Sequence, residues 1–137
     1  MSHIDIVREQ LKMDEGVKAK PYHCTAGKLT IGVGRNLEDV GLSPYEINVL
    51  LENDITRSEA DCKALFPSYD TLSDNRKAVL INMAFNLGKD RLSKFQMFRG
   101  AVMAKAWEQA ATEMLNSQWA KQVGPRAQRL AKQMREG

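Results

Sequence analysis

Apolar residues near the start of the chain recur at helical spacing. Three of them lie three and four positions apart, on one face of a helix: Ile4, Val7 and Leu11. Ser2 precedes them as a capping residue, and Asp5 follows three positions later as the acid of a capping box. Gly16 is typical of the position after a last helical turn. The pattern predicts a helix between Ser2 and Gly16.

The pattern then changes from helical to alternating. In "KLTIGVG" the apolar residues alternate with threonine or glycine, as they do in a short strand: Leu29, Ile31 and Val33. Proline and glycine punctuate the surrounding segment at Pro21, Gly27, Gly32 and Gly34. We predict a small antiparallel hairpin or sheet over residues 17–36.

A second helical pattern begins at "SPYE". Ser43 is suited to the N-cap, Pro44 to the first turn, and Glu46 completes a capping box. Apolar residues continue at helical spacing until Pro67 stops the helix. We predict one helix over 44–65, long enough to connect two lobes.

The remaining chain reads as helical throughout. "SDNRKAVLINMAFNLG" predicts a helix over 73–88 that is apolar nearly all round, as is typical of the centre of a bundle. Further helices are predicted over 93–103, 105–115 and 125–135. The fold class is therefore α+β within a single domain, 1–137. We expect a β-containing lobe over about 12–43, a connecting helix over 44–66, and a helical lobe formed by 67–137 plus 1–11.

Composition excludes several classes of protein. The chain has 137 residues, of which 43% are hydrophobic and 27% charged, as in ordinary globular domains. It has no apolar run of the ~20 residues that span a bilayer, and the charged N-terminus does not resemble a signal peptide. We expect a cytoplasmic location and no membrane insertion.

Net charge and cysteine content limit the kinds of ligand that we expect the chain to bind. The net charge of +3 suits an anionic partner, but no dense basic block with interleaved aromatics favours nucleic acid. Cys24 and Cys62 lack metal-binding spacing, also with His3 and His23, so we expect no metal and no cofactor. Free thiols fit a reducing compartment.

Glu15, Cys24 and Thr30 could together form a catalytic set, although none of them is unusual when considered alone. Eight residues separate Glu15 from Cys24, and five separate Cys24 from Thr30. A hairpin folded back on the end of the first helix would bring them to one wall of a cleft. A proton donor, a base or nucleophile and a hydroxyl that orients water are what hydrolysis of a glycosidic bond requires.

The pattern "DEG…Y…C…G…TIGVG" resembles the phage-type lysozymes, family 24 glycoside hydrolases. "YDTLSDNRKAVLINMAFNLG" looks like their central helix, and "AWEQAATEMLNSQWAKQVGPRAQR" looks like two later helices with a connecting turn. The resemblance implies a lysozyme-like fold and cleavage of the β-1,4 bond between N-acetylmuramic acid and N-acetylglucosamine in peptidoglycan.

The resemblance also implies roles for individual residues. Glu15 would protonate the leaving oxygen, Arg126 would pair with Glu15, and Thr30 would help to place the attacking water. Phe85 and Asn86 would line the substrate cleft, although Phe85 is equally suited to the core. We expect the two tryptophans, Trp107 and Trp119, to be core residues.

Two positions depart from the family pattern. Cys24 stands where the best-known members have Asp, and a free thiol is mostly protonated at neutral pH. Cys24 could act as a thiolate base, as a nucleophile, or only as a positional residue. A disulfide with Cys62 is a weaker alternative, because Cys62 reads as a buried residue. Arg35 stands where a well-studied member has His, and the short segment 36–42 predicts a small sheet.

The resulting hypothesis is a monomeric phage endolysin that reaches the cell wall after another protein permeabilises the membrane. Three alternatives stay open: a lytic transglycosylase or a glycosidase for chitin-like polymer, a non-catalytic wall-binding module, and a Cys24-based peptidase. The peptidase is the weakest, because His23 would point to the opposite side of a strand from Cys24.

Overall fold

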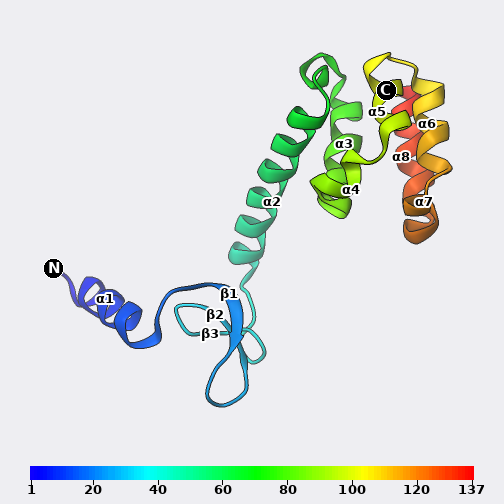
Figure 1. Cartoon of the computed structure of the whole chain (residues 1–137). Coiled ribbons are helices and arrows are strands. Elements are labelled where there is room, and N and C mark those ends of the chain that lie inside the picture. The colour runs from blue at the N-terminus through cyan, green and yellow to red at the C-terminus, as the bar shows by residue number, and fades with distance from the viewer. The chain divides into compact units, whose positions relative to one another are not determined.

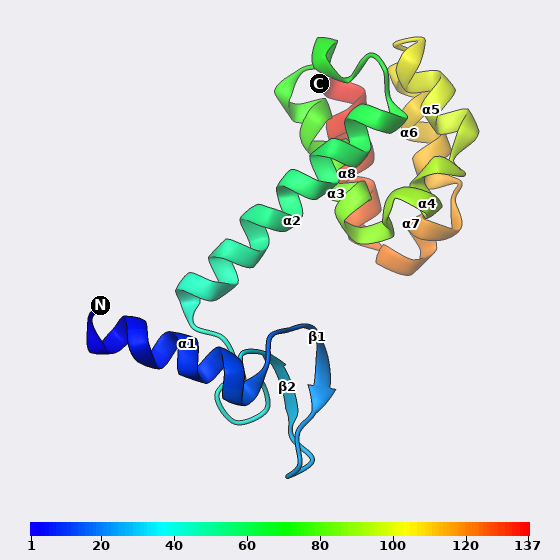
Figure 2. The same ribbon diagram turned by 60° about the vertical axis from the view of Figure 1, so that its left-hand side comes forward.

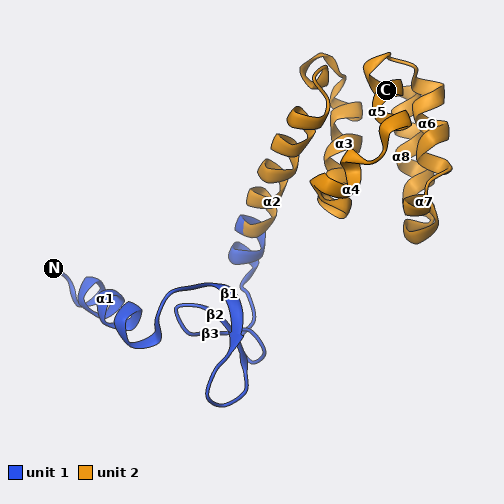
Figure 3. Cartoon of the chain, in the orientation of Figure 1, with its two compact units in different colours: residues 1–49 blue, residues 50–137 orange.

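The computed structural model describes residues 1–137, which divide into two units, Met1–Val49 and Leu50–Gly137 (Figure 3). The first unit contains one helix, a small sheet and the start of a long helix; the second is helical (Figure 1). This is the α+β, lysozyme-like class that the sequence predicts. The division into lobes, including the grouping of residues 1–11 with the helical lobe, stays a prediction.

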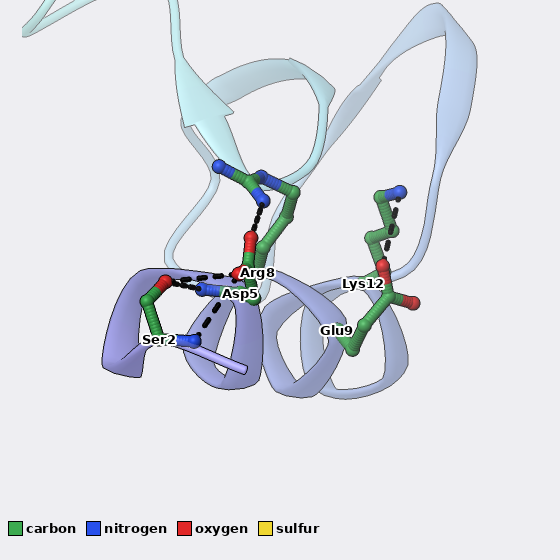
Figure 4. Close-up of polar contacts among 5 residues, drawn as sticks. All are labelled: Ser2, Asp5, Arg8, Glu9 and Lys12. Carbon is green, nitrogen blue, oxygen red and sulfur yellow. Dashed lines mark hydrogen bonds and ion pairs between the residues drawn. The ribbon is translucent and has the colours of Figure 1, made fainter.

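The first helix, α1 (His3–Glu15), has the predicted ends. The Ser2 hydroxyl accepts from the Asp5 backbone N–H at 3.2 Å, and the Asp5 carboxylate accepts from the Ser2 N–H at 3.2 Å, forming a capping box (Figure 4). Ion pairs from Arg8 to Asp5 and from Lys12 to Glu9 follow along the exposed surface. No residue of α1 is buried, so local capping and pairing define this helix.

The predicted sheet is present and small. It has three antiparallel strands in the order β1 (Lys18–His23), β2 (Leu29–Gly32) and β3 (Arg35–Asn36), the first two of which are visible in Figure 2. In the register, Thr30 lies opposite Tyr22 of β1 and opposite Asn36 of β3. The central strand therefore carries Thr30 between two partners.

The long helix α2 (Pro44–Leu65) has the predicted bounds and runs from the first unit into the second. The Ser43 hydroxyl accepts from the Glu46 N–H at 3.2 Å, and the Glu46 carboxylate accepts from the Ser43 N–H at 2.8 Å. The predicted capping box is thus confirmed. Neither α2 nor any other helix combines the length and apolar character needed to cross a bilayer.

The second unit contains a short 3₁₀ turn and six further helices: η1 (Tyr69–Thr71), α3 (Asp74–Leu87), α4 (Lys89–Ser93), α5 (Gln96–Met103), α6 (Trp107–Leu115), α7 (Gln118–Val123) and α8 (Pro125–Glu136). Figures 1 and 2 show α6 lying beside α5 and α8, and α3 also packs against α8. The core includes Phe66, Val79, Leu80, Met83 and Phe98.

Both ends of α3 are as predicted, because Ser73 caps its start and Gly88 follows its last residue. α3 contributes buried residues to the core, but its apolar surface is not covered all round, since Phe85 is 46% exposed. Of the two tryptophans, Trp119 is a core residue as predicted. Trp107 is half-buried at the core's edge, under the guanidinium of Arg76.

Three predicted boundaries in the second unit need correction. The helix predicted over 93–103 begins at Gln96, and α4 is a separate helix before it. The helix predicted over 105–115 begins at Trp107, because Lys105 has a φ of 56°, outside the helical range. The predicted connecting turn after α6 contains the six-residue helix α7. Helices of one or two turns are too short to show a clear apolar period.

Candidate active site

Glu15 is the last residue of α1, and its exposed side chain lies against the backbone of Gly34. A Cβ atom added to Gly34 would lie 2.9 Å from Oε2 of Glu15 and 3.1 Å from its Cδ. Gly34 also has a backbone φ angle of 65°, which residues with a side chain rarely adopt. The close approach of Glu15 to this turn therefore requires glycine.

Cys24 begins the turn between β1 and β2. Its backbone N–H donates to the Lys28 carbonyl at 3.0 Å, and the Gly27 N–H donates to the Cys24 carbonyl at 2.8 Å. The thiol of Cys24 is half-buried. Hydrogen bonds from backbone N–H groups lower its pKa, and the Lys28 group has the largest effect, followed by that of Ala26. Desolvation opposes this shift, and the Thr30 side chain adds to it. The turn favours the thiolate, the reactive form of cysteine.

Thr30 is 3% exposed at the centre of β2. Its hydroxyl donates to the Lys28 carbonyl at 2.8 Å. Because the hydroxyl has a single proton, this bond leaves its oxygen as an acceptor toward a water or a thiol. The backbone N–H groups are therefore the main stabilisers of a Cys24 thiolate.

The first unit thus brings Cys24 and Thr30 together around the carbonyl and amide of Lys28. It also places the Glu15 carboxyl at the turn between β2 and β3. Turn hydrogen bonds and antiparallel pairing set this arrangement. An acid and a stabilised thiolate on one small unit are suited to proton donation and base catalysis.

In the second unit, Phe85 and Asn86 lie on the last turn of α3, and both are exposed. The Asn86 side-chain carbonyl accepts from the Trp119 indole N–H at 2.9 Å. This bond orients the amide and leaves its NH₂ group as a donor. Phe85 lines a mostly apolar groove of about 410 Å³ with Leu51, Ile55, Ala78, Ile81, Asn82 and Arg126.

Arg126 forms the polar part of that groove. Its Nε and Nη2 atoms donate to the Asn82 side-chain carbonyl at 3.0 and 2.6 Å. Asn82 thus orients this guanidinium by two hydrogen bonds. The predicted pairing of Arg126 with Glu15 joins residues of different units and stays a prediction.

The two cysteines are free and have different environments. Cys62 is fully buried, as predicted, and burial with nearby Asp61 and Glu59 raises its pKa to about 12. Cys62 is therefore an inert thiol at neutral pH, whereas the backbone N–H groups of its turn lower the pKa of Cys24. No group of three or more His, Cys, Asp or Glu side chains is arranged to hold a metal ion.

Sequence reasoning did not identify Gly34 or Asn82 as parts of the candidate site. The "GVG" spacing could have indicated Gly34, because a glycine there suggests close approach of another group. Asn82 has no comparable signal, since a polar residue on a helix is ordinary. The ion pair of Arg35 with Glu46 was also missed, because its residues are 11 positions apart.

Comparison with known proteins identifies the family of this chain. Residues 12–136 match the sequence model of the family described as phage lysozyme. Two proteins of Dictyostelium discoideum, probable T4-type lysozyme 2 and probable T4-type lysozyme 1, are each 30% identical over 156 residues, which cover 93% of this chain and 92% of theirs. The pre-baseplate central spike protein Gp5 of Enterobacteria phage T4 is 28% identical over 150 residues, which cover 89% of this chain but 26% of Gp5. The chain therefore belongs to the phage lysozyme family, and it is a lysozyme-type glycoside hydrolase.

Proposed function

We propose that this enzyme hydrolyses the β-1,4 bond between N-acetylmuramic acid and N-acetylglucosamine in peptidoglycan. The observation that carries the proposal is that one small unit holds both the exposed Glu15 and a thiol whose ionised form the backbone N–H groups favour. Membership of the phage lysozyme family supports the reaction class and the wall polymer as substrate.

In the proposed mechanism, Glu15 donates its proton to the glycosidic oxygen as the bond from that oxygen to C1 of the sugar breaks. The Cys24 thiolate removes a proton from water, which Thr30 orients by accepting a hydrogen bond. The water oxygen bonds to C1 and leaves a reducing N-acetylmuramic acid end. This is acid–base catalysis with a thiolate in the place of a second carboxylate.

Side chains of the second unit are proposed to bind the sugar. Phe85 offers an exposed ring to the apolar face of a saccharide, and the Asn86 NH₂ group can donate to its carbonyl or hydroxyl oxygens. Arg126, whose guanidinium Asn82 orients by two hydrogen bonds, is the proposed supporting residue of the site.

The biological role that we propose is lysis of a bacterial host by a monomeric endolysin. The enzyme would accumulate in the host cytoplasm and reach the wall once a separate protein permeabilises the membrane. The net positive charge of the chain, +3, supports an anionic wall polymer as the partner.

Replacement of Glu15 by Gln tests the function, with Asp14→Asn as a matched control at the neighbouring exposed acid. We expect Glu15→Gln to lower the rate of clearing of a peptidoglycan suspension by about 10²–10⁴-fold, because an amide is too weak an acid to protonate the glycosidic oxygen. Asp14→Asn should stay within about twofold of the wild type, as expected for a surface residue.

Clearing by folded Glu15→Gln at the wild-type rate would exclude the assignment. Mass spectrometry of the wild-type products separates the alternatives. A reducing muramic acid end supports hydrolysis, and an anhydro ring indicates a transglycosylase. Wall binding without release of sugar indicates a non-catalytic module.

A further inference from the structure

Arg35 and Glu46 form a bidentate ion pair in the first unit. Nη1 of Arg35 donates to Oε1 of Glu46, and Nη2 lies beside Oε2, each at 2.7 Å. Nη1 also donates to the Gly41 carbonyl at 3.1 Å. Such two-point pairing fixes direction as well as distance.

Each partner is anchored to a different element. Glu46 accepts from the Ser43 N–H at the start of α2, so its carboxylate is held by the helix cap. Arg35 lies in β3 opposite Ile31 of β2. The pair therefore ties the edge of the sheet to the first turn of α2.

The residue immediately before Arg35 is Gly34, against which the Glu15 carboxyl rests. The two-residue strand β3 has few ladder hydrogen bonds of its own, so the bidentate ion pair is an important side-chain restraint on this end of the turn. A shift of β3 would move the surface that supports Glu15.

We propose that Arg35 is a positioning residue for the reaction: paired with Glu46, it holds the Gly34 backbone in the place that aims the Glu15 carboxyl. The inference rests on the proposed role of Glu15 as proton donor. Pairs as exposed as this one, at 36% and 34%, add little to overall stability. Small misplacements of a catalytic group, by contrast, lower the rate strongly.

The test uses Arg35→Gln, Glu46→Gln and the double variant in the full chain. Gln at position 46 keeps a side-chain oxygen for the Ser43 N–H but removes the ion pair. Arg57→Gln is the control, because it breaks an exposed pair with Asp54 elsewhere on α2. Initial rates on soluble peptidoglycan fragments, taken well below each melting temperature, separate kcat from KM.

We expect each single variant to lower kcat by about tenfold to hundredfold with KM within about twofold. The double variant should be no worse than the single ones, since all three lose the same pair. Arg57→Gln should match the wild type. Arg35→Lys keeps the positive charge but cannot pair through two nitrogen atoms, so this variant should lose part of the activity.

A second measurement does not depend on turnover. The Gly34 amide resonance should respond to the replacement Glu15→Gln, because the Glu15 carboxyl rests against Gly34. We expect this response to be reduced when the same replacement is made in the Arg35→Gln or the Glu46→Gln variant; if one of the two does not fold, the other carries the test.

Wild-type kcat and a wild-type Gly34 response in the folded Arg35 and Glu46 variants would overturn the inference. Loss of kcat in equal measure in Arg57→Gln would overturn it too. These outcomes differ from failure of the proposed function, in which Glu15→Gln itself keeps its activity.

Discussion

Gly34 and Gly88 both have positive φ angles but different surroundings. Their φ angles are 65° and 83°, so a side chain at either position strains the backbone. A Cβ at Gly34 would meet the Glu15 carboxyl, whereas a Cβ at Gly88 would have no atom within 4 Å. The pair separates backbone strain from displacement of Glu15.

We predict that Gly34→Ala and Gly88→Ala each lower the free energy of unfolding by about 1–2 kcal/mol. Only Gly34→Ala should also lower kcat, by about tenfold or more, because the methyl group displaces the catalytic acid. Thermal unfolding and initial rates check both parts. Equal kcat values for the two variants would contradict the placement of Glu15.

Measuring the reaction rate against pH tests the chemical role of Cys24. Its thiol pKa lies below the usual range because backbone N–H groups of Lys28 and Ala26 stabilise the thiolate. If the thiolate is the base, the rate should rise with pH as the thiol loses its proton. Cys24→Asp should remove that rise in the neutral range, because an aspartate is already ionised there.

Cys24→Ala and Cys24→Ser should lose about 10²-fold or more in kcat, since neither supplies a base. Activity of Cys24→Ala equal to the wild type would assign the thiol a positional role only. The anomer released first by the wild type then separates a base from a nucleophile, because direct attack by water inverts the configuration at C1.

At the scale of elements, helix caps explain why the starts of three helices could be predicted from the sequence. Ser2, Ser43 and Ser73 each begin a helix at the predicted place, because a capping residue and its partners are neighbours in sequence. The missed helices α4 and α7 have five and six residues. Their ends depend on packing in the second unit rather than on local pattern.

The start of α2 should make the first unit sensitive to acid. The Arg35 side-chain hydrogen bond and the Ser43 N–H lower the pKa of Glu46 to about 2. A lowered carboxyl pKa stabilises the fold above the unfolded value, near 4.5, and this contribution is lost as the pH falls toward 2. Because the pair is exposed, we expect only a small fall in the melting temperature over this window.

Glu46→Gln isolates this contribution because the amide does not titrate. The variant should melt below the wild type at neutral pH, and the difference should shrink as the pH falls from about 4.5 to 2. Calorimetry across that range measures it. A difference that does not vary with pH would contradict the role assigned to the Arg35–Glu46 pair.

At the scale of the whole molecule, charge is distributed unevenly between the units. Lys and Arg number 14 against 10 Asp and Glu in residues 50–137, and 6 against 7 in residues 1–49. The second unit therefore carries the positive charge expected to favour anionic wall polymers. The composition of the whole chain indicates this attraction but does not locate it.

The sequence by itself determined the main helices, the small sheet, the family and the identity of the candidate residues. Caps, turns and apolar periods act over a few positions, and the Glu15–Cys24–Thr30 spacing is a property of the chain. These features could therefore be predicted from the order of the residues alone.

Only the tertiary structure decided which groups surround the candidate residues. Gly34 beneath Glu15, the amides that favour the Cys24 thiolate, Asn82 on Arg126 and Arg35 on Glu46 all became visible in this way. The Gly34, Asn82 and Arg35 contacts join positions separated by 11 to 44 residues. The Cys24 contacts depend on the exact path of one turn. Hydrogen bonds and ion pairs act over a few ångströms in space, so the folded backbone decides which distant residues meet.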